Sequence, residues 1–222
     1  MDRALSIQSA VDRYVKEKHI FERFKNVVLD YFRTEPSLAM EVGSVVHSIK
    51  SRMKDPEHLR DKLSRKWDDG VEINEENVFD IITDMAGVRV LHLYQDQFPL
   101  IHACIARQVD QGDWYFHEAP RAYSWDPESS EFFSRLGLKP EIKPSLYTSI
   151  HYVLKPKADS VYCCELQVRT LFEEIWGEID HSLNYPHPTN NIACKEQIRV
   201  LSKLVSTGTR LADAIFRTHN PT

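Results

Sequence analysis

Two neighbouring stretches in the second half of the chain alternate between polar and apolar side chains, and they constrain the fold more than any other feature. They cover residues 147–154 and 160–169, and the residues between them, KPKAD, are typical of a turn. The pattern therefore predicts a β-hairpin. Because side chains alternate across a strand, one face of this hairpin is expected to carry Tyr147, Ser149, His151, Glu165, Gln167 and Arg169.

Helical and strand-like patterns follow one another along the rest of the chain. Apolar residues recur at helical spacing over residues 6–33, and Pro36 interrupts the run. Further helices are predicted at residues 37–47, 55–67, 74–84, 97–109, 128–136, 170–185 and 192–217, and further strands at residues 48–54, 87–94 and 114–123. This order predicts an α+β fold with a mixed, roughly five-stranded sheet flanked by helices.

The domain organisation and the compartment follow from length and composition. The 222 residues suffice for one substantial core, so we expect a single domain with N-terminal helices (1–45), a central core (46–187) and a C-terminal helix (188–222). No apolar run reaches the roughly 20 residues that a membrane-spanning helix needs. The four cysteines lack the spacing of a zinc site, which favours reduced thiols in a cytoplasm.

A basic cluster stands out against a net charge of −5, which argues against general polyanion binding. The strand 48–54 places Lys50, Arg52 and Lys54 on one face. The helix that follows carries Lys62 and Arg65. Guanidinium and ammonium groups on a strand end and the next helix can surround a polyphosphate. The alternative is a solvated helix face, since acidic residues lie among the basic ones.

Acidic residues at two positions suit a metal-nucleotide site. Asp84 precedes a predicted strand that contains Gly87 and Arg89, and this combination can hold a metal and a base. Glu165 and Gln167 belong to the polar hairpin face, where an acid and an amide suit the floor of such a site. Each feature alone is also compatible with an ordinary polar surface.

Four motifs in this order resemble the synthetase domain of the RelA/SpoT family, which makes the alarmones guanosine tetra- and pentaphosphate. The motifs are Ser51-Arg-x-Lys54, Asp84-x-Ala-Gly-x-Arg89, Tyr147-x-Ser-x-His151 and Glu165-x-Gln-x-Arg-Thr170. The segment Ile179–Tyr185 is similar to the last active-site helix of the family, and the resemblance extends over about residues 45–187. It implies a nucleotidyltransferase-like synthetase domain that transfers pyrophosphate from ATP to the 3′-hydroxyl of GDP or GTP and releases AMP.

The resemblance also implies a role for each matching residue. Asp84 and Glu165 would bind Mg²⁺, and Glu165 would take the proton of the attacking hydroxyl. The ATP-binding residues would be Arg52, Lys54, Lys62, Arg65 and Arg89, with the adenine between the arginines Arg52 and Arg89. The acceptor-binding residues would be Lys143, Tyr147, His151, Gln167 and Asp180, with the acceptor base stacked on Tyr147.

The sequence departs from the family pattern in three ways. Leu146 stands where the family usually has a glycine before the stacking tyrosine, so the acceptor loop is expected to run differently. Glu174 replaces a residue that is often neutral in small synthetases and is expected to repel an anionic acceptor. The family's hydrolase His-Asp pair is absent, which indicates a small, synthetase-only form.

The sequence leaves the acceptor and the partners open. One alternative is a toxin-type synthetase that modifies an adenine nucleotide or the 3′ end of tRNA, with RNA held by basic residues of the last helix: Lys195, Arg199, Lys203, Arg210 and Arg217. The acidic overall charge weakens this alternative. A second alternative is a non-catalytic nucleotide-binding module, against which the presence of Asp84 and Glu165 argues. The amphipathic terminal helices are compatible with a homo-oligomer such as a tetramer, and an antitoxin partner is a further alternative.

Overall fold

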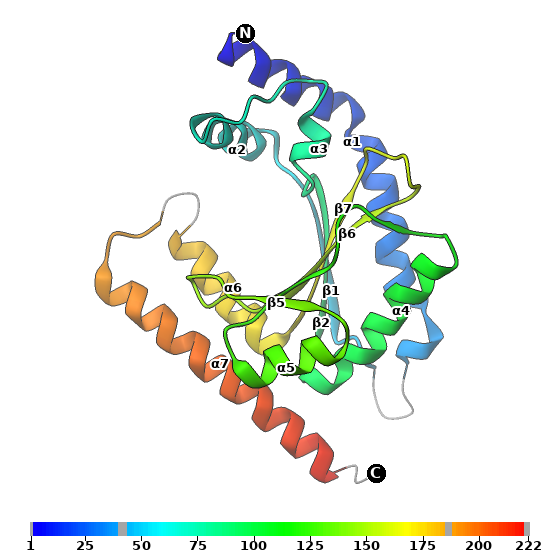
Figure 1. Ribbon diagram of the computed structural model, residues 1–222, viewed down its shortest axis with the longest axis vertical. Helices are drawn as coiled ribbons and strands as arrows, with labels where there is room; N and C mark the ends of the chain where they lie inside the picture. The colour runs from blue at the N-terminus through cyan, green and yellow to red at the C-terminus, as the bar shows by residue number, and fades with distance from the viewer. Residues whose placement is uncertain (1, 40–43, 185–187, 220–222) are drawn as a thin grey trace.

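A seven-stranded mixed sheet forms the centre of the molecule (Figure 1). The computed structural model describes residues 2–39, 44–184 and 188–219. The strands are β1 (Ser48–Met53), β2 (Ala86–His92), β3 (Tyr115–Phe116), β4 (Arg121–Tyr123), β5 (Lys139–Glu141), β6 (Ser149–Lys155) and β7 (Cys164–Thr170). Their order is β1-β2-β7-β6-β4-β5, with β3 beside β6. The expected α+β class and mixed sheet are confirmed, but the roughly five strands are seven, because residues 114–123 form two short strands and β5 was not foreseen.

The sheet is mixed because its long strands meet in both directions. β6 and β7 pair antiparallel, as the predicted hairpin requires, and β1 pairs antiparallel with β2. β2 and β7 are parallel, and β2 is buried along almost its whole length because neighbouring strands and helices cover it. The short edge strand β5 is parallel to β4.

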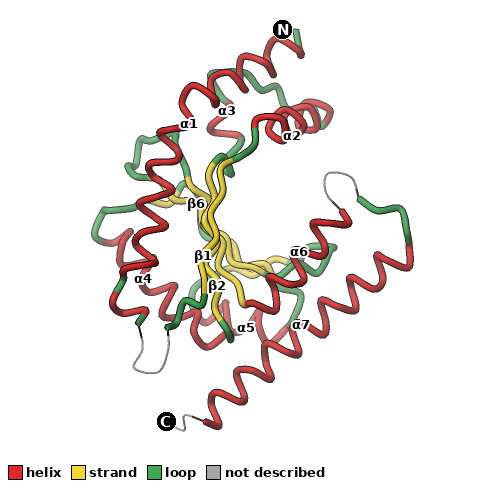
Figure 2. The backbone as a smooth tube through the Cα atoms, turned by 180° about the vertical axis from the view of Figure 1, so that it is seen from behind, coloured by secondary structure: helices red, strands yellow, loops and turns green. Residues whose placement is uncertain are grey.

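Helices cover the two faces of the sheet unequally. α1 (Arg3–Thr34) and α4 (Phe98–Asp110) lie on one face, and α6 (Leu171–Asn184) and α7 (Ile192–His219) lie together on the other side (Figures 1 and 2). α1 begins at Asp2, whose side chain accepts a hydrogen bond from the backbone of Ala4, and it ends before Pro36. The remaining helices are α2 (Pro56–Asp68), α3 (Val78–Ile81), α5 (Pro127–Arg135) and the 3₁₀ turns η1 (Pro36–Leu38) and η2 (Gln95–Gln97).

Two expected helices differ from the structure. The described part of residues 37–47 contains only the end of η1 and an isolated bridge between Ala39 and Ser44, and residues 40–43 lie outside the described part. The helix expected over residues 74–84 is reduced to the single turn α3. The side chain of Asn74 accepts hydrogen bonds from the backbone of Glu76 and Asn77, as an N-cap does, but Ile82 adopts an extended backbone conformation (φ −110°, ψ 97°), which ends the helix before Asp84.

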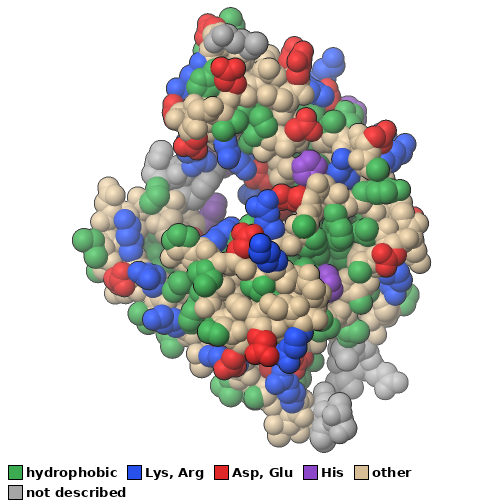
Figure 3. All heavy atoms as spheres, in the orientation of Figure 1, with side chains coloured by type: hydrophobic (Ala, Val, Ile, Leu, Met, Phe, Trp, Pro, Cys, Tyr) green, Lys and Arg blue, Asp and Glu red, His purple; other side chains and the backbone are tan. Residues whose placement is uncertain are grey.

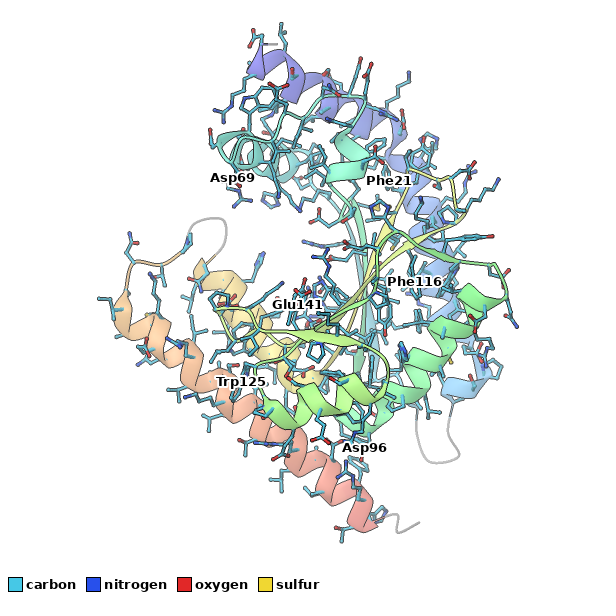
Figure 4. The ribbon with its side chains drawn as sticks, in the orientation of Figure 1. Phe21, Asp69, Asp96, Phe116, Trp125 and Glu141 are labelled. Atoms are coloured by element: carbon cyan, nitrogen blue, oxygen red, sulfur yellow. The ribbon has the colours of Figure 1, made fainter. Side chains whose placement is uncertain are left out.

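The main hydrophobic core lies between the sheet and the α1–α4 layer. Phe21 of α1 and Phe116 of β3, labelled in Figure 4, lie on this side. A second, small cluster joins α6 to α7 through Trp176, Ile198 and Val205, and Tyr147 packs against it. In the part of the chain that the structure describes, no helix is both long and apolar enough to cross a membrane. The division of the chain at residues 45 and 187 stays a prediction.

Candidate active site

A cavity of about 390 Å³ lies between the sheet and α6. In the space-filling view of Figure 3, the molecule is hollowed between the part that contains α2 and the part that contains α6 and α7, and charged side chains surround the hollow. The cavity is lined by Lys50, Ser51, Arg52, Gly87, Val88, Arg89, Tyr147, Glu165, Gln167, Arg169, Trp176, Gly177, Glu178, Asp180 and His181.

Strand register brings the sheet residues of this cavity together. Lys50 pairs with Arg89, Arg89 with Gln167, and Gln167 with His151, so the four residues form one row across β1, β2, β7 and β6. Residues that pair directly share a face of the sheet. Glu165 lies two residues from Gln167 on β7 and therefore on the same face. The polar hairpin face that the sequence predicted is thus present and continues onto β1 and β2.

Three of these side chains form a chain of hydrogen bonds. The Tyr147 hydroxyl lies 2.8 Å from Nε2 of His151, and Nδ1 of His151 lies 3.1 Å from Oε1 of Glu165. Burial lowers the pKa of His151, which favours the neutral ring. With a proton on Nδ1, the neutral imidazole donates to Glu165 and accepts from Tyr147. Gln167 donates to the second oxygen of Glu165 at 3.0 Å.

Glu165 is ionised although it is buried. Burial acts to raise its pKa, but the hydrogen bond from His151 outweighs this and holds the pKa below its ordinary value. The negative charge of Asp84 acts to raise the pKa of Glu165. A buried carboxylate in this state can accept a proton from a nearby group.

Asp84 is surrounded by the basic cluster. Its two oxygens lie 2.8 Å from Nζ of Lys54 and 2.8 Å from Nζ of Lys62, and Arg52 lies 3.9 Å away. Burial acts to raise the pKa of Asp84, but the lysine charges lower it to about 2. The hydroxyl of Tyr14 donates to the carbonyl of Lys54 and so fixes the end of β1 beside Asp84.

Arg89 is held by carboxylates of α6. Its Nη1 lies 2.8 Å from Glu174 and 2.9 Å from Glu178, and its Nε donates to Gln167 at 3.3 Å. Glu174 also contacts Lys50 at 2.7 Å and Arg169 at 3.5 Å. The expected repulsion of an anion by Glu174 is therefore offset by three cations around its carboxylate.

Side chains of α6 and α7 stabilise Tyr147 and the residue before it. Its ring lies 5.9 Å from that of Trp176, and the guanidinium of Arg169 lies 5.6 Å from its centre. Leu146 before it adopts φ 61°, the left-handed conformation that favours glycine, and its carbonyl accepts a hydrogen bond from Ser202 of α7 at 2.8 Å. The leucine thus takes the backbone conformation that a glycine would adopt freely. The different path expected for the acceptor loop stays a prediction.

Lys143 lies beside two aromatic rings. Its Nζ is 3.6 Å from the centre of the Tyr123 ring and 4.8 Å from that of Tyr147, and burial lowers its pKa. Tyr123 also contacts the ring of His151 at 5.1 Å. Tyr123 was not among the site residues predicted from the sequence, although its strand was expected. Only the pairing of Tyr123 with Ser149 places it on the face of the candidate site.

The other expected site residues are distributed around this centre. Asp180 lines the cavity and accepts a hydrogen bond from Asn184 at 2.8 Å. Arg65 lies on α2 and is not part of the cavity lining, whereas Lys62 on the same helix reaches Asp84. Of the basic stripe on α7, Arg210 and Arg217 pair with acidic residues, Arg217 with Asp96, which Figure 4 labels beside α7. The last residue of the expected active-site helix, Tyr185, lies outside the described residues.

The chemistry of Asp84 and Glu165 fits Mg²⁺. Both carboxylates are ionised, as metal ligation requires, and carboxylate oxygens are ligands that Mg²⁺ prefers. Within residues 2–39, 44–184 and 188–219, no group of three or more His, Cys, Asp or Glu side chains is arranged to hold a metal. Two carboxylates suffice for an ion that takes its other ligands from nucleotide phosphates and water.

A comparison with protein-family models decides the family. Residues 51–190, well over half of the chain, match the model described as the region found in RelA/SpoT proteins. The chain belongs to the RelA/SpoT family. The matched region of this RelA/SpoT chain includes both carboxylates, the Tyr147 loop and α6, so the four motifs lie within the region that defines the family. No curated protein sequence matches the chain significantly.

Solved structures similar to this RelA/SpoT chain show the same fold. The crystal structure of small alarmone synthetase 1 from Bacillus subtilis bound to its product pppGpp superposes with a TM-score of 0.69 at 21% identity, over 94% of this chain and 96% of that one. A GTP pyrophosphokinase family protein from Streptococcus pneumoniae gives a TM-score of 0.65 at 19% identity, over 92% and 90% of the two chains. The fold that the resemblance implied is confirmed.

Proposed function

We propose that this protein transfers the β,γ-pyrophosphate of ATP to the 3′-hydroxyl of GDP or GTP, producing AMP and guanosine tetra- or pentaphosphate. The observation that carries the proposal is the RelA/SpoT match over residues 51–190, which includes nearly the whole lining of the cavity. The B. subtilis enzyme of the same fold was crystallised with pppGpp and with the ATP analogue AMPCPP. Nucleotide ligands of this kind suit a cavity with ionised carboxylates, cations and an aromatic ring.

On the donor side, the cations of β1, β2 and α2 bind ATP. Arg52 and Arg89 extend from neighbouring strands and would hold the adenine between their guanidinium planes. Lys54, Lys62 and Arg65 would bind the phosphates. Both lysines contact Asp84 in the structure, so ATP binding would place phosphate oxygens around ammonium groups that this carboxylate already orients.

On the acceptor side, the Tyr147 ring would stack on the base. Lys143 and His151 would contact the acceptor phosphates, and Gln167 and Asp180 would complete the site from β7 and α6. Tyr123 lies beneath Lys143 and restricts the directions in which this lysine can point. We therefore add Tyr123 to the residues that position the acceptor.

The reaction is a displacement at the β-phosphorus. The 3′-oxygen of the acceptor forms a bond to the β-phosphorus, the bond from this phosphorus to the oxygen it shares with the α-phosphate breaks, and AMP leaves with that oxygen. Glu165 accepts the proton of the 3′-hydroxyl, since it is buried and ionised. Mg²⁺ held by Asp84 and Glu165 would neutralise charge on the transferred group. Positioning and charge neutralisation account for most of the catalysis in reactions of this kind.

An acceptor screen tests the proposal. The protein is incubated with Mg²⁺, ATP labelled at the γ-phosphate, and GDP, GTP, ADP, ATP or deacylated tRNA in turn, and the species that takes up the label is identified. We expect label on GDP or GTP, and a loss of at least about 100-fold in Glu165→Gln. Label on an adenine nucleotide or on tRNA alone would support the toxin-type alternative. No label on any acceptor, with wild type and Glu165→Gln alike, would support the non-catalytic module.

The location, the oligomeric state and the protein partner of the enzyme stay predictions. A cytoplasmic location, a homo-oligomer such as a tetramer and an antitoxin partner are expectations from the sequence and from the family resemblance. The hypothesis that α7 binds tRNA is weakened, because Arg210 pairs with Asp126 and Glu128, and Arg217 pairs with Asp96. The screen above measures tRNA directly.

A further inference from the structure

Glu174 is a buried carboxylate with three cationic partners. Its side chain is 7% exposed, and its oxygens lie 2.7 Å from Lys50, 2.8 Å from Arg89 and 3.5 Å from Arg169. Burial acts to raise its pKa, but the hydrogen bond from Lys50 and the charges of Arg169 and Arg89 lower it, so the residue is anionic at neutral pH. A buried charge of this kind is tolerated only because its partners are fixed around it.

Two of these partners belong to different halves of the candidate site. Arg89 extends from β2 on the side where the donor base would bind, and Arg169 extends from β7 beneath the Tyr147 ring, where the acceptor base would stack. Glu174 lies in the first turn of α6 and contacts both arginines. One carboxylate therefore sets the position of a guanidinium in each half.

We propose that Glu174 is a positioning residue that orients Arg89 and Arg169 together, so that one carboxylate supports the binding of both the donor nucleotide and the acceptor nucleotide. The inference rests on the proposed function, because it assigns Arg89 to the donor and Tyr147 to the acceptor. Arg89 fixed at two oxygens of Glu174, 2.8 Å and 3.0 Å from its Nη1, cannot rotate freely, so its plane is already set when a base arrives. Arg169 has Gln167 and Glu174 as its polar contacts in the described residues, so loss of Glu174 frees it to move beneath the ring.

Glu178 provides a matched comparison one helical turn away. It contacts Arg89 at 2.9 Å and Lys50 at 3.8 Å, as Glu174 does, but no contact to Arg169 is present among the described side chains. Its side chain is 57% exposed, so its ion pairs are screened by water. Substitution of Glu178 is therefore expected to affect the binding of the donor nucleotide alone.

The experiment compares Glu174→Gln, Glu178→Gln and the exposed control Glu196→Gln. Dissociation constants for AMPCPP and for GDP are measured separately by calorimetry, and KM and kcat follow from the labelled-ATP assay. We expect Glu174→Gln to weaken both nucleotides about tenfold, the loss of a charged hydrogen bond for each. Glu178→Gln should weaken AMPCPP alone, and Glu196→Gln neither. Because the hydrogen bonds between Tyr147, His151 and Glu165 are intact in Glu174→Gln, its kcat should fall by a smaller factor than its KM values rise. Glu174→Asp should restore part of the affinity for both nucleotides.

The outcomes separate the inference from the proposed function. Weaker binding of only one nucleotide by Glu174→Gln, or equal effects of Glu174→Gln and Glu178→Gln on GDP, would refute the shared role of Glu174 while wild-type transfer remained intact. Absence of transfer and of nucleotide binding in the wild type would instead refute the proposed function. If Glu174→Gln does not fold, as judged by circular dichroism, Glu174→Asp carries the same comparison, and unchanged affinity for both nucleotides in it overturns the proposal.

Discussion

Replacement of Gly177 by alanine tests the position of Arg169 directly. Gly177 lies in the middle of α6, where alanine favours the helix by about 1 kcal/mol over glycine. A Cβ at this position would lie 2.4 Å from Nη1 of Arg169, so the guanidinium must move by about 1 Å to reach ordinary contact distance. The substitution therefore has two opposing effects on stability. Alanine stabilises the helix, and the displacement of a buried arginine destabilises the fold.

The geometry of Arg169 determines the size of the loss. Its side chain is 4% exposed, and its Nη2 donates to Gln167 at 2.5 Å. Breaking one hydrogen bond of a buried cation costs about 2 kcal/mol, which exceeds the helix gain, so we expect Gly177→Ala to be less stable by about 1 kcal/mol. We also expect the KM for GDP to rise about tenfold, because Arg169 no longer supports the Tyr147 ring.

Urea unfolding and the labelled-ATP assay measure the two effects. In an Arg169→Met background the guanidinium is absent, so Gly177→Ala should instead stabilise the protein by about 1 kcal/mol and leave the KM for GDP unchanged. A stabilised Gly177→Ala with the KM of the wild type would refute the packing of Arg169 against Gly177.

Three further substitutions test other parts of the structure. Asp84→Asn should lower the free energy of unfolding at pH 7 by about 2 kcal/mol. Since the pKa of Asp84 is lowered to about 2, the stabilisation by its carboxylate is present above about pH 4 and is lost as the pH falls towards 2. Urea unfolding along a pH series measures this loss. His92→Leu should make the stability of the protein less sensitive to acid, because burial lowers the pKa of His92 to about 4. The free energy of unfolding of the wild type relative to this variant should fall by about 2 kcal/mol between pH 7 and pH 5. A constant difference would contradict the lowered pKa of His92. Leu146→Gly should be more stable than Leu146→Ala by about 1 kcal/mol in thermal unfolding, because φ at this residue is 61°; the reverse order would show that the left-handed conformation is not held.

Local sequence periodicity predicted one face of the site correctly. Tyr147, His151, Glu165 and Gln167 were expected to share a face because they occupy alternate positions of the two predicted strands. In the structure Tyr147 lies just before β6, and hydrogen bonds connect the four side chains. The period of a strand is a property of its backbone and does not depend on distant residues. The same reasoning placed Lys50 and Arg52 together on β1, whose strand was also predicted.

Periodicity did not predict where an element is interrupted. The pattern of residues 74–84 resembles a helix, but only Val78–Ile81 is helical, because the backbone becomes extended at Ile82. The predicted strand 114–123 is divided into β3 and β4, and Tyr123 reaches the site only through the pairing of β4 with β6.

The sequence by itself determined which side chains share a face of each long strand and, through its match over residues 51–190, the family. It also contains the two carboxylates and the cations that we propose bind the nucleotides. Only the tertiary structure decided which of these groups meet: Asp84 with Lys54 and Lys62, and Glu174 with Arg89 and Arg169. The reason is physical. The direction of a side chain follows from the backbone next to it, whereas a buried ion pair depends on the parallel pairing of β2 with β7 and on the packing of α2 and α6, which join residues far apart in the chain.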